Sequence, residues 1–176
     1  MRILLREDEI RQGVRRMAEE IRRRYADRPL TIVGILTGSV VLLADLIRLV
    51  DLPLRVGVIQ ASSYRNSTAP GPLAINLDVV PEVAGRDVLL VDDIFDSGRT
   101  LQRIVGEMQR RGARSIRSAV LLRKDVPRQV AIEPDFVAFE IPNEFVVGYG
   151  LDYRDAYRNL PYVAALGDEE IEREPD

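Results

Sequence analysis

One segment of the sequence is Val88-Leu89-Leu90-Val91-Asp92-Asp93-Ile94-Phe95-Asp96-Ser97-Gly98-Arg99-Thr100-Leu101. It begins with a short, continuously apolar run, which is typical of a strand buried on both faces of a parallel sheet. Three carboxylates follow, and a Ser-Gly-Arg-Thr turn then opens a helix expected over Thr100–Arg111 and closed by Gly112. A buried strand that leads through a tight turn into a helix indicates an α/β fold.

The same alternation of strands and helices continues on both sides of this segment. Apolar residues recur at helical spacing from Glu7 to Tyr25, and Ser39 to Val50 predicts a second helix. Strands are expected at Leu30–Leu36, Leu54–Gln60, Leu73–Leu77, Asp87–Val91, Ile116–Leu122, Phe136–Ile141 and Phe145–Val147. The sequence therefore predicts one α/β domain over residues 1–166, with a mainly parallel sheet flanked by helices, and an acidic tail over residues 167–176. In such sheets ligands bind beyond the carboxyl ends of the strands.

The composition excludes several classes of function. The chain has 176 residues, 46% of them hydrophobic, and a net charge of -3, which suits one globular domain without a broad basic surface for nucleic acid. It contains no Cys and no His, which excludes thiolate nucleophiles, Ser-His-Asp triads and histidine metal centres. Neither a secretory signal nor a membrane span is evident. We therefore expect a cytoplasmic protein that binds neither membranes nor nucleic acids.

Lysine is nearly absent from the sequence. The chain has 25 basic residues, and all are Arg except Lys124. A general bias toward Arg explains most of this count, but it does not explain why one position differs. A compact ammonium and a planar guanidinium differ in shape and hydration, so Lys124 is a candidate functional residue.

The segment after the apolar run has the composition of a site for a phosphate and a sugar. Backbone N–H groups at the start of a helix, together with the hydroxyls of Ser97 and Thr100, can bind an anion, and Gly98 lets the backbone approach it closely. Carboxylates can accept hydrogen bonds from ribose hydroxyls. The simpler alternative is that Asp92 and Asp93 end a strand and that Asp96 or Ser97 caps the helix. A lone Asp-Ser before a helix would favour the cap, but the whole string favours a binding site.

This segment resembles the phosphoribosyl pyrophosphate motif of type I phosphoribosyltransferases, in which an apolar strand precedes two acidic residues and Asp-Ser/Thr-Gly-x-Thr. The resemblance implies that Asp92 and Asp93 hold the ribose hydroxyls and that the loop 96–100 binds the 5′-phosphate. It also implies that Asp96 is the catalytic acid/base, close to N7 of a purine. Pyrophosphate and Mg²⁺ belong to the same expected chemistry.

A second segment, Phe139–Arg154, resembles the hood of the hypoxanthine-guanine branch of this family. The resemblance implies a small hood built from the N-terminal segment and about residues 130–166. There Phe145 would stack on the purine, with Val146 and Leu151 beside it. Arg158 would bind pyrophosphate. The metal ligands would be Asp152, Asp92 and Asp93.

Further loops match the same family. Lys124 matches the lysine that donates to O6 of the purine, Leu36-Thr37-Gly38 follows the first strand as the pyrophosphate loop does, and a cis peptide bond is expected between Leu36 and Thr37. Ser63 and Tyr64 open the expected flap, at residues 62–76. The full set expected to bind substrate is Leu36, Thr37, Gly38, Ser63, Tyr64, Asp92, Asp93, Ile94, Asp96, Ser97, Gly98, Arg99, Thr100, Lys124, Phe145, Val146, Leu151 and Arg158.

The resemblance covers roughly residues 5–166 and implies purine salvage: a purine base and phosphoribosyl pyrophosphate would give a nucleoside monophosphate and pyrophosphate. A homodimer or homotetramer is expected. The departures are modest, since Asp92 replaces the commoner Glu and Thr37 stands where a basic residue is frequent. The alternatives are an RNA-binding regulator on the same fold, a catalytically silent nucleotide sensor and an unrelated phosphate-binding enzyme. Preference among hypoxanthine, guanine and xanthine is left open.

Overall fold

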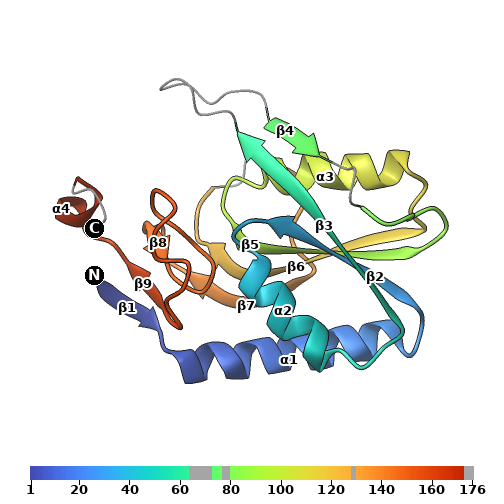
Figure 1. The fold of residues 1–176 in the computed structure, drawn as a ribbon, viewed down its shortest axis with the longest axis horizontal. Helices are drawn as coiled ribbons and strands as arrows, with labels where there is room; N and C mark the ends of the chain where they lie inside the picture. Colours follow the sequence, from blue (N-terminus) through green and yellow to red (C-terminus); the bar gives the residue numbers. More distant parts are fainter. Residues whose placement is uncertain (64–72, 77–79, 128–129, 173–176) are drawn as a thin grey trace.

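A computed structural model describes residues 1–63, 73–76, 80–127 and 130–172 of the chain (Figure 1). A six-stranded sheet has the order β4-β3-β2-β5-β6-β7, and all neighbouring pairs are parallel except β3 and β4. The strands are β2 (Leu30–Leu36), β3 (Leu54–Ser63), β4 (Leu73–Asn76), β5 (Asp87–Phe95), β6 (Ser115–Lys124) and β7 (Phe136–Ile141). The expected α/β fold with a mainly parallel sheet is confirmed.

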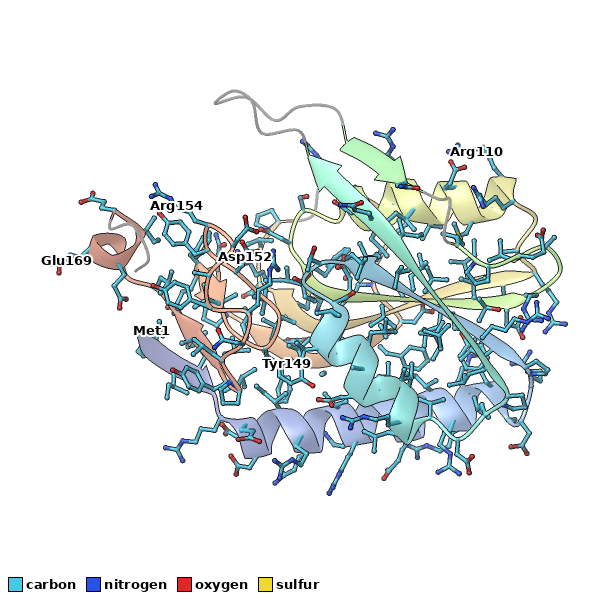
Figure 2. All side chains as sticks on the ribbon, viewed as in Figure 1. Met1, Arg110, Tyr149, Asp152, Arg154 and Glu169 are labelled. Carbon is cyan, nitrogen blue, oxygen red and sulfur yellow. The ribbon has the colours of Figure 1, made fainter. Side chains whose placement is uncertain are left out.

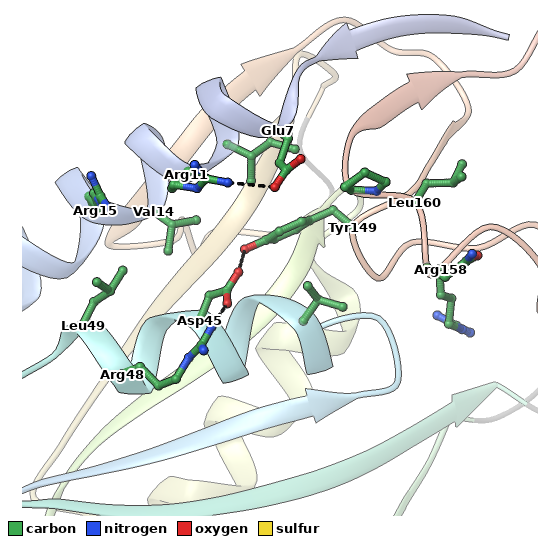
Figure 3. Close-up of a pocket in the computed structure, with 14 residues that line it drawn as sticks. Glu7, Arg11, Val14, Arg15, Asp45, Arg48, Leu49, Tyr149, Arg158 and Leu160 are labelled. Atoms are coloured by element: carbon green, nitrogen blue, oxygen red, sulfur yellow. Dashed lines mark hydrogen bonds and ion pairs between the residues drawn. The ribbon is translucent and has the colours of Figure 1, made fainter.

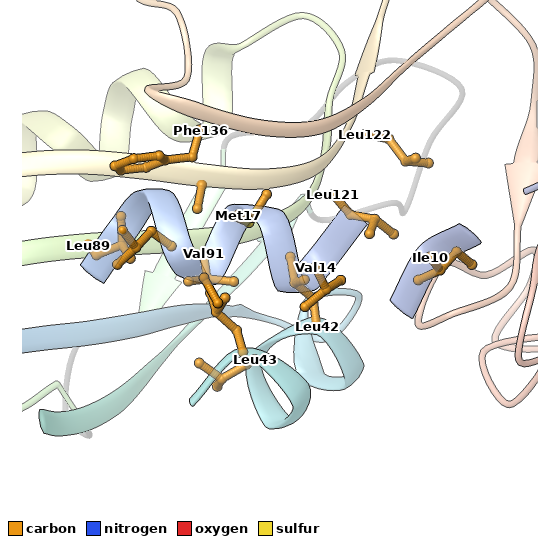
Figure 4. Close-up of a cluster of buried hydrophobic side chains, with 14 of the residues drawn as sticks. Ile10, Val14, Met17, Leu42, Leu43, Leu89, Val91, Leu121, Leu122 and Phe136 are labelled. Carbon is orange, nitrogen blue, oxygen red and sulfur yellow. The ribbon is translucent and has the colours of Figure 1, made fainter. Parts of the chain in front are cut away.

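Helices cover both faces of this sheet. Helices α1 (Glu7–Tyr25) and α2 (Val40–Leu49) lie on one face, and α3 (Arg99–Arg110) lies on the other (Figure 1). Strand β5 shows how the sequence builds this arrangement, because alternate side chains of a strand point to opposite faces. Leu89 and Val91 pack with α1 and α2 (Figure 4), whereas Val88 and Leu90 pack with α3. Both faces of β5 are apolar for this reason.

A second, antiparallel sheet has the order β1-β9-β8 and joins the two ends of the chain. It consists of β1 (Arg2–Leu5), β8 (Val146–Val147) and β9 (Val163–Ala165), and a short helix, α4 (Asp168–Ile171), follows. We call this sheet with the connecting residues 142–162 the hood. The sequence did not predict β1, β9 or α4. Strand β7, within the range expected for the hood, pairs with β6 in the main sheet.

The remaining differences from the expected elements lie at their ends. Strand β5 continues to Phe95 rather than ending at Val91, because its pairing with β6 extends to Phe95↔Arg123. Asp92 and Asp93 therefore stand on the last residues of the strand, and only Asp96 lies in the loop that follows. Helix α3 ends as expected, with Gly112 at a positive φ of 77° just beyond it and its N–H donating to the Gln109 carbonyl. The hairpin-like return after β3 is also confirmed, since β4 pairs antiparallel with it.

Asp87 anchors the end of β5 opposite the carboxylates. Its side chain is 2% exposed and accepts hydrogen bonds from Arg114 at 3.0 and 2.5 Å and from Ser115 at 2.7 Å. Arg28 adds an ion pair at 3.5 Å. The hydrogen bond from Arg114 lowers the pKa of Asp87 from 3.8 to about 2. The charged carboxylate therefore joins β5 to the connection after α1 and to the start of β6 at this edge.

We expect Asp87→Asn to lower the free energy of unfolding at pH 7 by about 2 kcal/mol. The folded-state pKa lies below 3.8, so the carboxylate stabilises the fold above about pH 4, and this contribution declines as the pH falls toward 2. Urea unfolding of both proteins between pH 7 and pH 3 checks this. A difference between them that is independent of pH would contradict it.

Candidate active site

A cavity of about 440 Å³ lies at the carboxyl ends of β2 and β5, where the fold predicts a ligand site. Of the expected residues, it is lined by Leu36, Thr37, Gly38, Asp92, Asp93, Ile94, Asp96, Ser97, Gly98, Thr100, Asp152 and Arg158. The sequence interpretation missed Ile35, Ala61, Phe95 and Leu101, which complete the lining. These apolar residues lie next to or within the motif loops. The only sequence feature that could have identified them is that they neighbour the motif residues in the chain.

Asp92 and Asp93 form a tight acidic pair on this cavity. Both are half-buried at the end of β5, and the carboxylate of each accepts a hydrogen bond from the next backbone N–H, at 3.0 Å for Asp92 and 2.8 Å for Asp93. Burial raises the pKa of both carboxyls, and the charge of Asp93 raises the pKa of Asp92 further. Such a pair is stabilised when positive charge appears next to it.

The loop after β5 presents backbone donors to the same cavity. Gly98 has a φ of 76° and precedes α3, whose N-terminus has no side-chain cap. Because the first N–H groups of a helix lack partners within the helix, they can bind a phosphate. A Cβ at Gly98 would also lie 2.4 Å from the Val130 side chain. Ser97 and Thr100 line the cavity beside these donors, while Arg99 is exposed and does not.

A second loop, Leu36–Ser39, faces the acidic pair from β2. Its Leu36–Thr37 peptide bond is cis, as expected. A Cβ at Gly38 would lie 1.6 Å from Oδ2 of Asp93, so only glycine lets this loop approach the end of β5 so closely. The loop leads directly into α2, and the Ser39 hydroxyl donates to the Ile35 carbonyl at 2.6 Å. A second helix therefore begins directly after a loop that lines the site.

The hood contributes a cation and a carboxylate. The Nη2 atom of Arg158 pairs with Oδ1 of Asp152 at 2.7 Å, and its Nη1 atom donates to the Gly150 carbonyl at 2.7 Å. The positive charge of Arg158 also tends to lower the pKa of Asp93. These contacts hold the guanidinium within reach of an anion bound between the two loops.

Lys124 and Asp96 meet at one end of the site. Strand β6 ends at Lys124, and the Nζ atom of Lys124 lies 3.4 Å from Oδ2 of Asp96. The Lys124 side chain is 12% exposed, whereas that of Asp96 is 55% exposed. The structure therefore pairs two residues that are 28 positions apart and that the sequence interpretation assigned to neighbouring atoms of a purine.

Four expected base-binding residues, Lys124 and three residues of the hood, do not line the cavity. Phe145 is 42% exposed, and its ring meets that of Tyr153 edge-on at a centroid distance of 5.5 Å. The side chains of Val146 and Leu151 are each 5% exposed and pack into the core on the α1 side of the sheet. Base contacts by Val146 would therefore come from its backbone. The roles of Phe145, Val146 and Leu151 in base binding stay predictions.

The expected flap is only partly described. Ser63 is the last residue of β3 and pairs with Leu73 of β4. Tyr64 lies outside the described residues.

The carboxylates at the cavity can be tested as metal ligands. Within the described residues, no group of three or more Asp and Glu side chains is arranged to hold a metal ion by itself. Magnesium is commonly held by one or two carboxylates, with substrate phosphates and water as further ligands. The pair Asp92 and Asp93, with Asp152 across the cavity, fits magnesium that arrives with a phosphate-bearing ligand.

Comparison with known proteins identifies this arrangement. The model of the phosphoribosyl transferase domain matches residues 3–154. The chain belongs to the phosphoribosyltransferase family. The expected family and fold are therefore confirmed. A hypoxanthine-guanine phosphoribosyltransferase of Streptococcus pneumoniae is 41% identical over 169 residues, which cover 96% of this phosphoribosyltransferase and 94% of the relative.

Solved structures and longer relatives agree with this assignment. A hypoxanthine phosphoribosyltransferase from Staphylococcus aureus superimposes with a TM-score of 0.89 at 38% identity, over 96% of this phosphoribosyltransferase and 92% of that chain. A "Bifunctional protein TilS/HprT" of Listeria innocua is 43% identical over 166 residues, and the present chain spans 26% of its length. No helix in the described part of the chain is long and apolar enough to cross a membrane.

Proposed function

We propose that this phosphoribosyltransferase acts in purine salvage. It transfers the 5-phosphoribosyl group from phosphoribosyl pyrophosphate to hypoxanthine, guanine or both, and releases the nucleoside monophosphate and pyrophosphate. The pairing of Lys124 with Asp96, at the edge of a cavity built from two anion-binding loops, carries this proposal. The named relatives support it.

The choice of a 6-oxopurine follows from hydrogen-bonding chemistry. O6 and N7 lie on the same edge of the base, so one ligand can engage both members of the Lys124–Asp96 pair. The ammonium of Lys124 has only donors and suits the O6 acceptor, whereas the 6-amino group of adenine would present a second donor. A site that depends on a polar contact of this kind rejects the analogue that cannot make it.

The residues at the cavity divide the chemical work. Pyrophosphate departs with the electron pair of its bond to ribose C1, and a purine nitrogen forms the new bond at that carbon. The positive charge that develops on the ribose faces Asp92 and Asp93, where it relieves the repulsion within the pair. Arg158 binds the departing anion, and Asp96 accepts the proton that the purine gives up at N7.

The proposal includes a cofactor, a location and an assembly. Asp152, with Asp92 and Asp93, would hold Mg²⁺, whose charge neutralises pyrophosphate oxygens when it is bound. We further propose a cytoplasmic location and a homodimer or homotetramer, as in the sequence interpretation. Nucleic acids and membranes are not among the proposed partners.

Nucleotide formation from hypoxanthine, guanine, xanthine and adenine, each with phosphoribosyl pyrophosphate and magnesium, tests the function. Product from 6-oxopurines but not from adenine supports it and also gives the substrate preference. No product from any purine, with folded protein, would refute it and would favour a sensor or regulator with this fold.

Replacing Lys124 by Ala is expected to raise the KM for the 6-oxopurine about tenfold or more, since a hydrogen bond from a charged group is lost. The KM for phosphoribosyl pyrophosphate should change much less, because the anion-binding loops stay intact. Steady-state kinetics with each substrate varied in turn checks this. Lys124→Arg serves as the control that keeps the charge, and unchanged affinity for purine and nucleotide in Lys124→Ala would contradict the role.

A further inference from the structure

The segment Gly148–Leu151 forms a strained turn where the hood meets the active site. Gly148, Tyr149 and Gly150 have φ values of 95°, 50° and 101°. The left-handed region is uncommon for a bulky residue such as Tyr, and surrounding contacts must hold it there. The Tyr149 N–H donates to the Leu160 carbonyl at 2.8 Å, and the Gly150 N–H donates to the Arg158 carbonyl at 2.9 Å. The turn is thus bound to the backbone that carries Arg158.

The Tyr149 side chain makes a second connection, to helix α2. Its hydroxyl donates to Oδ2 of Asp45 at 2.6 Å, and the residue is 8% exposed (Figures 2 and 3). Burial, with help from Asp45, raises the pKa of Tyr149, so the hydroxyl stays protonated and donates. Asp45 also pairs with Arg48 and keeps a side-chain exposure of 36%. Removal of the Tyr149 hydroxyl would therefore leave Asp45 paired and partly solvated.

Both ends of this hydrogen bond lead to groups expected to bind pyrophosphate. On one side, α2 begins directly after the loop Leu36–Ser39. On the other side, Gly150 accepts from Arg158 at 2.7 Å and packs so closely on Gly38 that a Cβ at Gly150 would lie 2.1 Å from the Gly38 carbonyl oxygen.

Arg158 stands between two cavities. It lines the active-site cavity and also a cavity of about 650 Å³ whose wall includes Tyr149 and Asp45 (Figure 3). The Tyr149–Asp45 bond therefore lies on the wall of the second cavity, which Arg158 shares, and not on the wall of the active-site cavity. A contact in this place can set the position of Arg158 without touching substrate.

We infer that the Tyr149–Asp45 hydrogen bond is a positioning contact that fixes Arg158 and the loop Leu36–Ser39 relative to each other for the binding of pyrophosphate. The inference rests on the proposed function, because it assigns the contact to the anion that this reaction releases. It is selective. The 5′-phosphate is expected at the separate loop 96–100, which Tyr149 and Asp45 do not contact.

Tyr149→Phe tests this positioning role. We expect a rise of about fivefold to tenfold in the KM for phosphoribosyl pyrophosphate and in the Kd of magnesium pyrophosphate, in line with the loss of one hydrogen bond to a charged group. The KM for the purine and the Kd of guanosine monophosphate should change little. Steady-state kinetics and calorimetric titration of each ligand give these four quantities.

Variants of Asp45, which accepts the hydrogen bond, sharpen the test. Asp45→Asn keeps an acceptor, and its affinity for magnesium pyrophosphate should remain close to that of the wild type. Asp45→Ala should weaken this affinity as much as Tyr149→Phe does. The double variant Tyr149→Phe/Asp45→Ala should bind magnesium pyrophosphate no more weakly than either single variant, because both substitutions remove the same contact. Tyr162→Phe removes a hydroxyl from the same hood segment, away from Asp45, and should leave both affinities unchanged.

The outcomes separate this inference from the proposed function. If Tyr149→Phe loses equal affinity for magnesium pyrophosphate and for guanosine monophosphate, or loses none for either, the positioning role is overturned even in an active enzyme. Wild-type protein that forms no nucleotide would refute the proposed function. Selective weakening of magnesium pyrophosphate binding by Tyr149→Phe would still support the positioning role in that protein.

Discussion

Replacement of Asp96 by Asn is expected to lower kcat about 100-fold or more, the lower range for the loss of a positioned acid/base group. Asn has nearly the shape of Asp, but it cannot accept and hold a proton at purine N7. The Asp96 side chain is 55% exposed, so the substitution should not disturb the fold. The ion pair with Lys124 at 3.4 Å is lost as well, and the KM for the purine should rise modestly.

Single-turnover measurements at saturating substrates separate the chemical step from product release and so test this directly. Asp51→Asn provides a matched control, because Asp51 is an exposed carboxylate outside the cavity. Wild-type turnover in Asp96→Asn would remove Asp96 from the catalytic role. Loss of activity accompanied by unfolding would contradict the expectation that the fold is preserved.

Gly38→Ala is expected to reduce kcat/KM by about 100-fold, as a displacement of roughly 1 Å in an active site can do. The new Cβ would lie 1.6 Å from Oδ2 and 2.5 Å from Cγ of Asp93. Because the Asp93 side chain is displaced more easily than the backbone at residue 38, its carboxylate should move away from that of Asp92. The defect should therefore appear in activity with only a small change in the free energy of unfolding.

Gly106→Ala is the matched control for this substitution. Gly106 lies within α3, and a Cβ there would meet nothing within 4 Å. Alanine in a helix interior is favoured over glycine by up to about 1 kcal/mol, so this variant should be slightly stabilised and fully active. Kinetics and urea unfolding of both variants give the comparison. Full activity in Gly38→Ala would show that Asp93 need not occupy its observed place.

The sequence predicted the features that depend on local pattern. Continuous apolar runs located the parallel strands, and Gly112 located the end of α3. The motif loops were found because strand, turn and helix follow one another without interruption. Eleven of the residues expected to bind substrate, including Asp93 and Arg158, line one cavity, since parallel strands bring their carboxyl ends to the same edge of the sheet.

The features that escaped prediction depend on partners far away in the chain. Strands β1 and β9 have four and three residues; β1 pairs with β9, and β9 lies between β1 and β8. The Tyr149–Asp45 contact joins residues 104 positions apart. Nothing in the local sequence of either residue marks it, because the contact arises only when the hood packs against α2.

The single lysine of the chain has a practical chemical consequence. Reagents that acylate primary amines do not react appreciably with guanidinium groups, which stay protonated. In this sequence such a reagent therefore finds a single side-chain amine to modify, Nζ of Lys124. The Lys124 side chain is only 12% exposed and sits against Asp96. One mass increment at residue 124 thus reports, in the unaltered protein, whether the Lys124–Asp96 end of the site is accessible or covered.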